Sequence, residues 1–313
     1  MYDPSLSQLI SQAIARLNTD LAEAAPFMAG QLSGWFEQLS GSRQPEDYFK
    51  HPLAFPSLLL PWWAEITLTG QPDLAFQADL IYSTINGYYY IRLIDNLMDG
   101  HATIELKLLP ALNFFHTQFQ SAYQHYFAAG HPFWQRFTAV WFRSGEAAMQ
   151  DAALTDLDET RFKQVAAQKI CAANIPLAAV CYRYDRPDLI YAWSDLVDLL
   201  GCWHQLHNDL FDWYRDDSRQ NRTYFLSEAE RRRRPGEPVA GWVAREGFDW
   251  AIEKLLAWLE HLRRQAAPLG SEPLLAYLDT REQLLIEQKE RASAGLHSLA
   301  RLAAISGFKK GDD

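Results

Sequence analysis

The sequence predicts an all-α protein, and two observations support this prediction. Apolar residues recur at helical spacing along most of the 313-residue chain, in segments that are long. Segments of strand length that alternate polar and apolar residues are absent from the sequence, as are Val-, Ile- and Thr-rich segments between turn residues. The apolar content of 48% is that of a globular protein, so bulk disorder is excluded.

Helices are expected over most of the chain. An amphipathic segment spans residues 6–39 and is expected to break near Pro26. Three prolines between residues 52 and 61 forbid a continuous helix there. The polar segment 215–237 predicts a flexible loop with a short helix. The remaining helices are expected at residues 73–98, 104–128, 132–153, 158–181, 187–216, 239–265 and 272–305.

The sequence predicts a single domain over residues 1–313. No internal repeat and no low-complexity linker divides it. The long apolar helix at 73–98 predicts a large bundle of roughly nine or ten helices, in which the central helices are buried nearly all round.

Charge and cysteine content exclude several classes of protein. Lys and Arg number 29 against 39 Asp and Glu, and the net charge of −10 argues against nucleic-acid binding. The three cysteines form no CxxC pair, which favours a reducing cytoplasm over a disulfide framework or a zinc site. The first residues do not resemble a signal peptide, and no run of 18 apolar residues predicts a transmembrane helix. The unusual feature is the aromatic content, which includes 11 Trp.

The first candidate motif ends the apolar helix at 73–98. Asp95 and Asp99 are four residues apart, so they share one helical face, and Gly100 is expected to end the helix. Like charges at this spacing destabilise an isolated helix by about 0.2–0.5 kcal/mol. Because the preceding run is apolar, the pair is expected to face the core, where a hard cation such as Mg²⁺ would compensate the repulsion.

The second motif lies in the helix expected at 187–216. Asn208, Asp212 and Asp216 recur every four residues and form a second oxygen-rich face, which His204 extends by one turn. Asp209 could share that face or point to solvent. Either acidic face alone is more often a solvated surface. Two such faces at the ends of long apolar helices, each with an arginine nearby, favour a site for metal ions and a diphosphate.

Together the motifs resemble those of the class I isoprenoid synthases, and most closely those of the squalene/phytoene synthase family. Their first motif, C-R-x-x-D-x-x-x-D-G, is similar to Arg92, Asp95, Asp99 and Gly100. Their second, Q-L-T-N-I-L-R-D-x-x-E-D-x-R-x-x-R-x-Y, is similar without a gap at Gln205, Asn208, Asp212, Asp216, Arg222 and Tyr224. Residues 57–61 are similar to an L-L-P segment that precedes the first motif.

The resemblance implies the isoprenoid synthase fold with a central active-site cavity. It implies that Mg²⁺, or Mn²⁺, is held by five residues that are also the catalytic ones: Asp95, Asp99, Asn208, Asp212 and Asp216. It assigns the substrate diphosphate to Arg92, Lys169, Arg222 and Tyr224. Aromatic rings attract a carbocation by about 0.5–2 kcal/mol each, and the expected cavity lining is Tyr88, Tyr89, Trp203 and Phe211. Each of these residues also has a purely structural interpretation. Arg92 could form a salt bridge with Asp95, Arg222 could be an ordinary charged residue of a loop, and each aromatic residue could pack in the core.

Departures from the family pattern shape the predicted reaction. The R-R-G that elongating prenyltransferases carry after the first motif is missing, which argues against chain elongation. Of the Y-C-x-x-V-A-G segment only Cys171 remains, which argues against head-to-head condensation. The second motif is also similar to those of trans-polyprenyl synthases and terpene cyclases.

The predicted function is therefore that of a terpene synthase-like enzyme that ionises one allylic prenyl diphosphate and cyclises or quenches the cation. Head-to-head condensation of two prenyl diphosphates is the alternative, and a non-catalytic helical scaffold is the third hypothesis. The expected partner is the prenyl diphosphate and not nucleic acid. A homodimer and a transient membrane association for a hydrophobic product are left open.

Overall fold

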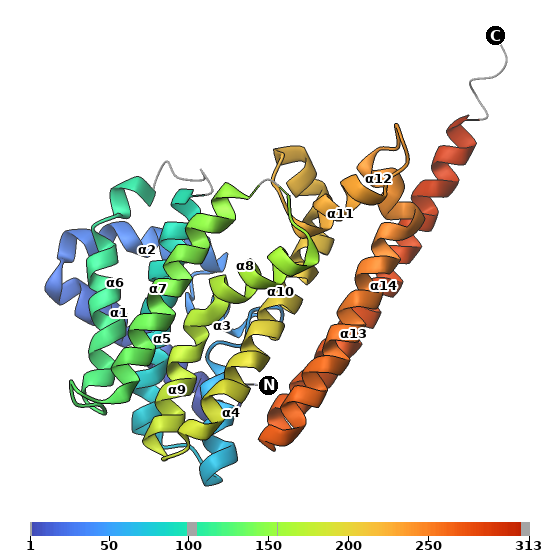
Figure 1. Cartoon of the computed structure of the whole chain (residues 1–313). Helices are drawn as coiled ribbons and strands as arrows, with labels where there is room; N and C mark the ends of the chain where they lie inside the picture. The colour runs from blue at the N-terminus through green and yellow to red at the C-terminus, as the bar shows by residue number, and fades with distance from the viewer. Residues whose placement is uncertain (1, 99–104, 155, 308–313) are drawn as a thin grey trace.

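The computed structural model describes residues 2–98, 105–154 and 156–307, and within these ranges it contains helices and no strand (Figure 1). The all-α prediction is therefore confirmed. The first half of the chain forms α1 (Pro4–Ala24), α2 (Pro26–Ser40), α3 (Glu46–Lys50), α4 (Leu59–Thr69), α5 (Leu74–Met98), α6 (Ala111–Gln124) and α7 (Pro132–Ala153). The second half forms α8 (Glu159–Ile170), α9 (Asn174–Arg183), α10 (Ile190–Arg219), α11 (Tyr224–Arg232), α12 (Val239–Trp242), α13 (Phe248–Ala266) and α14 (Glu272–Gly307).

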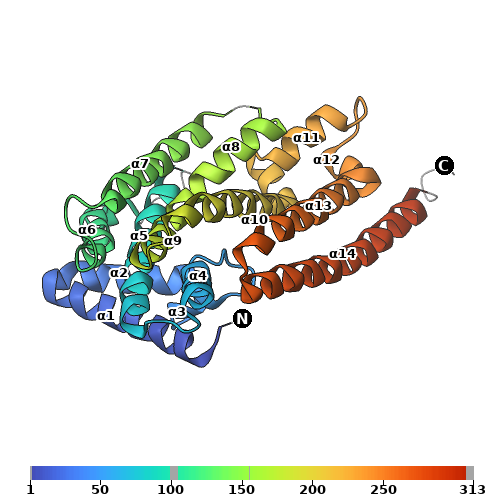
Figure 2. The ribbon, with the colours of Figure 1, turned by 60° about the horizontal axis from the view of Figure 1, so that its bottom comes forward.

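Two long helices organise the bundle. α5 packs along α1 and α6, and α10 packs along α8 and α13. α7 lies against α8 and α9, and its Trp141 and Phe137 rings pack on Tyr90 of α5 and Phe119 of α6, so it connects the two groups. α13 and α14 form an antiparallel hairpin, and the C-terminal part of α14 extends beyond the other helices in both views (Figures 1 and 2).

Several helix boundaries follow from proline positions. α1 ends at Ala24 and α2 begins with Pro26 in its first turn, so the predicted break is confirmed. Pro61 also lies in the first turn of a helix, α4, where its missing N–H has no intrahelical partner to lose. The proline-rich segment therefore lacks a continuous helix, as expected, but its last part already belongs to α4.

Other boundaries correct the sequence-based ones. The helix expected at 158–181 is divided into α8 and α9 by a 3₁₀ turn, Cys171–Ala173, because Pro176 in the first turn of α9 cannot continue the hydrogen-bond ladder. The helix expected at 239–265 contains a π turn, Val243–Gly247. A Cβ atom on Gly247 would lie 2.5 Å from the Trp242 ring, so only glycine fits there. These two divisions and the additional helices α3 and α4 give 14 α-helices in the described part of the chain instead of nine or ten.

The polar segment 215–237, expected to be a flexible loop with a short helix, is mostly helical. The first residues of this segment belong to α10, which ends at Arg219. The residue after it, Gln220, has φ of 58° and caps the helix. α11 is the short helix that the sequence predicted. Thr223 caps α11, because its hydroxyl accepts a hydrogen bond from the Leu226 N–H at 3.2 Å.

The aromatic excess is mainly core. Seven of the 11 tryptophans are buried in the hydrophobic cluster that runs between the helices: Trp35, Trp62, Trp63, Trp193, Trp203, Trp242 and Trp258. Aromatic side chains bury large areas, and each area removed from water stabilises the fold. Most of the tryptophan content therefore needs no functional explanation.

Candidate functional site

Asp95 lies in the last turns of α5 and is the described carboxylate of the first motif. Its side chain is 25% exposed. The Arg92 guanidinium, one turn earlier, donates to Asp95 Oδ2 at 3.3 Å. Asp99, Gly100 and the segment up to residue 104 lie outside the described residues, so Asp95 alone represents the first acidic face.

A lysine from another helix reaches the same carboxylate. Lys169 Nζ, near the end of α8, lies 3.6 Å from Asp95 Oδ1. It also lies 2.7 Å from Asp151 Oδ2 on α7. The ion pairs therefore join α5, α7 and α8 at one point. The sequence assigned Lys169 to the site of Asp95, and the structure brings the two side chains together.

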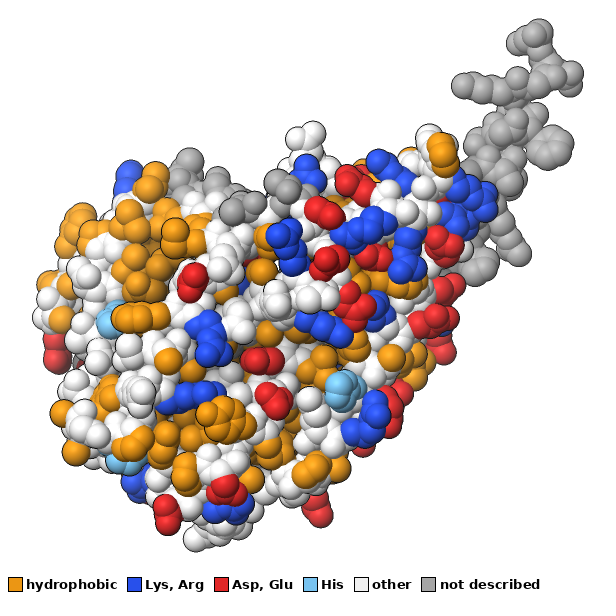
Figure 3. Space-filling view, viewed as in Figure 1, with side chains coloured by type: hydrophobic (Ala, Val, Ile, Leu, Met, Phe, Trp, Pro, Cys, Tyr) orange, Lys and Arg blue, Asp and Glu red, His pale blue; other side chains and the backbone are white. Residues whose placement is uncertain are grey.

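Hydrophobic side chains gather on the surface around this point. In the view of Figure 3 they lie mainly over the α6 and α7 side of the molecule, whereas charges of both signs gather toward α11 and α12. Phe142 and Met149 on α7 are each 69% exposed. Exposed apolar side chains that adjoin each other are unusual on a protein surface and often mark a binding site.

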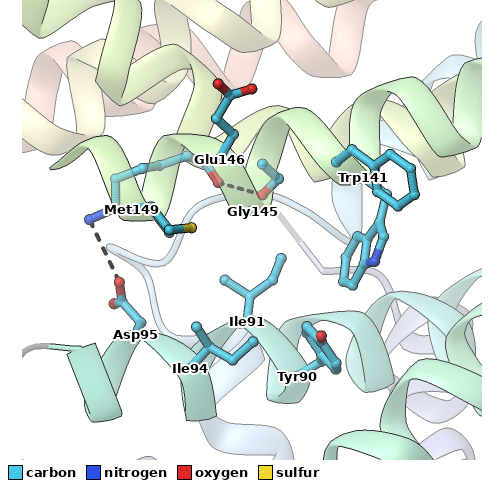
Figure 4. A pocket seen from close by; sticks show the side chains of 12 residues that line it. Tyr90, Ile91, Ile94, Asp95, Trp141, Gly145, Glu146 and Met149 are labelled. Carbon is cyan, nitrogen blue, oxygen red and sulfur yellow. Dashed lines mark hydrogen bonds and ion pairs between the residues drawn. The ribbon is translucent and has the colours of Figure 1, made fainter. Parts of the chain in front are cut away.

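A cavity of about 440 Å³ opens between α5 and α7 beside these residues. Figure 4 shows Tyr90, Ile91 and Ile94 of α5 on one wall and Trp141, Gly145 and Met149 of α7 on the other, with Asp95 at one end. The complete lining is Tyr90, Ile91, Ile94, Asp95, Trp141, Phe142, Ser144, Gly145, Glu146, Ala148, Met149 and Lys169. The cavity is thus mainly apolar and carries the Asp95–Lys169 pair at its polar end.

Most of these lining residues were not predicted from the sequence, although the spacing of one of them, Ile91, could have indicated it. Ile91 precedes Asp95 by four residues, so it shares a helical face with that carboxylate. The aromatic partner Trp141 comes from α7, and its ring centroid lies 5.1 Å from that of Tyr90. No pattern within α7 indicates that its Trp141 side faces α5, because this depends on how the two helices pack.

The second motif occupies the last turns of α10. Asn208 is exposed, whereas Asp212 and Asp216 are half-buried. Asp212 forms a salt bridge with Arg215 on the next turn, and Asp216 accepts a hydrogen bond from Asn221 Nδ2 at 3.0 Å. Arg222, in the connection from α10 to α11, is exposed.

Asp209, which the sequence left open, is buried. Its side chain is 2% exposed and accepts hydrogen bonds from Gln205 Nε2 at 2.8 Å and from the Tyr224 N–H at 3.2 Å. Burial raises the pKa of Asp209 to about 7. Asp209 therefore holds the start of α11 against α10. It also positions Tyr224, a predicted diphosphate ligand, whose ring stacks on Phe162 with centroids 4.6 Å apart.

The described residues do not form a metal-binding group. Among the ranges given above, no three Asp, Glu, His or Cys side chains come close enough to share a metal ion. The predicted metal site includes Asp99, which lies outside those ranges. The assignment of Mg²⁺ or Mn²⁺ to the two motifs therefore stays a prediction.

The four aromatic residues predicted to line a cavity have other contacts in this structure. Tyr88 is hydrogen-bonded to the Tyr48 hydroxyl, and Tyr89 is buried in a cluster with Trp35, Phe36 and Phe115. Trp203 donates from Nε1 to the Leu255 carbonyl at 3.1 Å, which ties α10 to α13. Phe211 packs on His207. None of the four lines the cavity between α5 and α7.

One described segment has the length and composition of a membrane span. Residues Glu159–Arg183, which include α8 and α9, have a mean hydropathy of 1.3 over 18 residues, and 67% of that window is buried in the protein. Core helices of globular proteins pass the same test, so this segment is weak evidence for a membrane.

Comparison with known proteins does not assign a family to this chain. No protein-family model matches it, and no curated protein matches it either. The resemblance to isoprenoid synthases therefore depends on the motif residues, and the function that they indicate is a proposal.

Proposed function

We propose that this protein is a Mg²⁺-dependent class I isoprenoid synthase, with the bundle of that family over residues 1–313. The proposed reaction is ionisation of one allylic prenyl diphosphate, release of diphosphate, and cyclisation or quenching of the carbocation. One observation supports it best: the acidic Asp95 and the basic Lys169 meet at the polar end of an apolar, aromatic cavity. A prenyl diphosphate has the same two parts, a charged head and an apolar chain.

The polar end suits the diphosphate head. In the proposal, Asp95 and Asp99 hold the metal ions together with Asn208, Asp212 and Asp216, which do not line the cavity between α5 and α7. These oxygen donors are the type that Mg²⁺ prefers. Bound Mg²⁺ would supply neutralisation of the charge that develops on the leaving group. Lys169 and Arg92 would add donors to the same oxygens, together with Arg222 and Tyr224.

The apolar end suits the chain. The volume of about 440 Å³ lies in the range of about 300–1,000 Å³ that is usual for small-molecule sites. Tyr90 and Trp141 present two aromatic rings to the cavity, and such rings attract a carbocation through their faces. The aliphatic side chains Ile91 and Ile94 would exclude the water that would otherwise quench it.

The location proposed for the enzyme is the cytoplasm. All three cysteines are free thiols buried in the core, as Cys171, Cys181 and Cys202. Free buried thiols are compatible with a reducing compartment. A transient contact with membranes, for release of an apolar product, is part of the same proposal.

The test is incubation with geranyl, farnesyl and geranylgeranyl diphosphate in MgCl₂, with assay of released diphosphate and analysis of the organic products. We expect release that EDTA abolishes and that Asp95→Asn lowers by at least about 100-fold. The matched control is Asp188→Asn, because Asp188 is 60% exposed and is paired with Arg186 instead of Lys169. That control should keep full activity.

The products separate the hypotheses. A cyclic or hydroxylated product with the carbon number of one substrate supports the terpene synthase-like reaction. A product of doubled carbon number would support head-to-head condensation instead. No release from any of the three substrates, with either Mg²⁺ or Mn²⁺, would refute both reactions and support the scaffold hypothesis.

A further inference from the structure

Arg281 is a buried arginine for which the described residues supply no hydrogen-bond partner. It lies on α14 and its side chain is 1% exposed. Its three nitrogens, Nε, Nη1 and Nη2, are all inaccessible and make no hydrogen bond with any described residue. It is the one residue with three such nitrogens among those that the structure describes.

The side chains around Arg281 are aromatic or neutral. Its guanidinium lies over the Tyr277 ring, 4.5 Å from the centroid. The Tyr277 hydroxyl is hydrogen-bonded to His204 Nε2 at 2.9 Å, across the interface of α10 and α14. Trp63 of α4 packs on Tyr277, and Phe55 packs on His204. The charge is therefore enclosed between α4, α10 and α14.

Among the described neighbours of Arg281, no carboxylate neutralises this charge. Within the described part of the chain, Arg281 makes no ion pair with an Asp or Glu. Burial lowers the pKa of His204 well below its usual value, and the Arg281 charge lowers it further. Burial also raises the pKa of Tyr277 to about 12, which keeps its hydroxyl neutral at pH 7.

An isolated buried cation is strongly unfavourable unless it is paired and hydrogen-bonded. The face of Tyr277 attracts the guanidinium but cannot accept its in-plane N–H groups. Arginine keeps its charge in proteins, so deprotonation does not relieve the penalty. The missing partner must be an acceptor with negative charge.

We infer that Arg281, with Tyr277 and His204, forms a binding site for an oxyanion between α4, α10 and α14. The planar fork of the guanidinium matches a group with two oxygens, as in a carboxylate or a phosphate. The Tyr277–His204 pair supplies a further donor beside it. This site is separate from the cavity at Asp95 and does not depend on the proposed function, because it uses none of the residues that line that cavity.

The test measures stabilisation by small anions. Protein dialysed against HEPES is equilibrated overnight with sodium phosphate, sodium acetate or sodium chloride at equal ionic strength, and its Tm is measured. We expect phosphate or acetate to raise the Tm by about 3 °C at ten times its Kd, beyond any effect of chloride. The anion that raises the Tm at the lower concentration, phosphate or acetate, shows whether the site prefers a phosphate or a carboxylate group. An equal effect of chloride would overturn the assignment to an oxyanion.

Variants connect the effect to the residue. Arg281→Met keeps an unbranched side chain but removes the guanidinium and its charge, so it should lose the anion response and show an equal or higher Tm without anions. Arg291→Met is the control on the same helix, since Arg291 is 78% exposed, and it should keep the response. If Arg281→Met keeps the response, or if the wild-type protein has none, the inference is wrong.

A third variant separates a structural role from binding. Arg281→Lys keeps the charge but loses the fork, so its apparent affinity for the anion should fall at least tenfold while its response persists. If Arg281→Met and Arg281→Lys both fold less stably and titrate with the wild-type affinity, Arg281 is only structural and the site is refuted. Asp95→Asn should leave the response intact, which separates a failure here from a failure of the proposed reaction.

Discussion

Lys169 of α8 reaches Asp95 of α5 with its Nζ 3.6 Å from Oδ1, and it holds Asp151 of α7 at 2.7 Å with the same nitrogen. The lysine therefore stands between two carboxylates that would otherwise repel each other. Its side chain is 31% exposed, so a ligand can still reach it. A substitution of Lys169 is therefore the most direct test of whether the site binds an anionic head group.

Lys169→Met should weaken substrate binding more than it weakens the fold. Ion pairs that remain partly exposed contribute only about 0–1 kcal/mol to stability. If Lys169 binds the diphosphate as proposed, its loss should raise the KM for a prenyl diphosphate by about tenfold or more. Steady-state kinetics with diphosphate detection measure this, and Lys169→Arg should restore part of the loss.

The control for Lys169 is on the same helix. Lys163 is paired with Glu159 one turn earlier and is 42% exposed. Lys163→Met should leave the KM unchanged. Equal KM values for Lys169→Met and Lys163→Met would contradict a role of Lys169 in substrate binding and leave it as a structural cation.

Gly145 controls the free volume of the cavity. It lies on α7 in the lining, and a Cβ atom built on it meets nothing within 4 Å. Gly145→Phe should therefore fold and fill part of the cavity, so that kcat/KM falls most for the longest prenyl substrate. Competition assays with substrates of different length measure this ratio.

Two further variants serve as controls for Gly145→Phe. Gly145→Ala should raise the free energy of unfolding by about 0.5–1 kcal/mol, because glycine inside a helix is destabilising. Gly34→Phe on α2, which also meets open space, should leave substrate selectivity unchanged. If Gly145→Phe keeps the wild-type preference for chain length, the substrate chain does not occupy this cavity.

Gly201 permits the close crossing of α8 and α10. A Cβ atom there would lie 2.3 Å from Ile170 Cγ2, which is well inside van der Waals contact. Gly201→Ala should lower the free energy of unfolding by about 1–3 kcal/mol through overpacking. Urea denaturation measures it. Because Ile170 adjoins Lys169, the same change should also lower activity.

A double-mutant cycle checks that explanation. Ile170→Ala removes the atom that the new methyl group would strike, so the double variant should be more stable than the sum of the two single changes predicts. Gly30→Ala on α2, where the Cβ position is open, should be neutral or slightly stabilising. Additive effects of Gly201→Ala and Ile170→Ala would rule out the proposed clash.

Asp198 on α10 should make stability depend on pH. Burial raises its pKa to about 6, the neighbouring Asp195 adds to the rise, and Arg143 opposes it. Its Oδ1 is inaccessible and has no hydrogen-bond partner among the described residues. Between pH 4 and 6 the folded protein holds a proton that the unfolded chain has released, so this group lowers stability as the pH rises.

Asp198→Asn should remove that dependence. The variant should gain stability relative to the wild-type protein between pH 4 and 6, by about 1–2 kcal/mol in the free energy of unfolding. Denaturation at several pH values measures the gain. Asp188→Asn should show no such change between pH 5 and 6, because Arg186 lowers the pKa of exposed Asp188 and this carboxylate is ionised there in both the folded and the unfolded chain. A constant difference between Asp198→Asn and wild type across this range would contradict the prediction.

Local sequence patterns predicted the helices well wherever the cause was local. The break between α1 and α2 follows from Pro26, and α7 begins at Pro132 and ends at Ala153 as expected. The divisions at Cys171–Ala173 and Val243–Gly247 were missed. The second depends on a contact between Gly247 and the Trp242 ring, which no helical pattern contains.

The candidate site was predicted only in part. The sequence placed Asp95 and Lys169 in one site, and the ion pair between them agrees with that. It did not indicate Trp141 as the partner of Tyr90, and it left Asp209 open. Arg281 gave no signal at all, since an arginine on an amphipathic helix is normally a surface residue.

By itself, the sequence determined the helical class, the proline-defined breaks and the acidic spacing of the two motifs. These depend on the period of the helix and on the backbone chemistry of single residues, which are local properties. The tertiary structure alone decided which face of each helix meets a neighbour. Because of this packing, Tyr90 lies at a cavity and Tyr89 lies in the core, and Arg281 is enclosed among neutral side chains. Packing between helices distant in sequence sets these environments, because burial and charge pairing are properties of the assembled bundle.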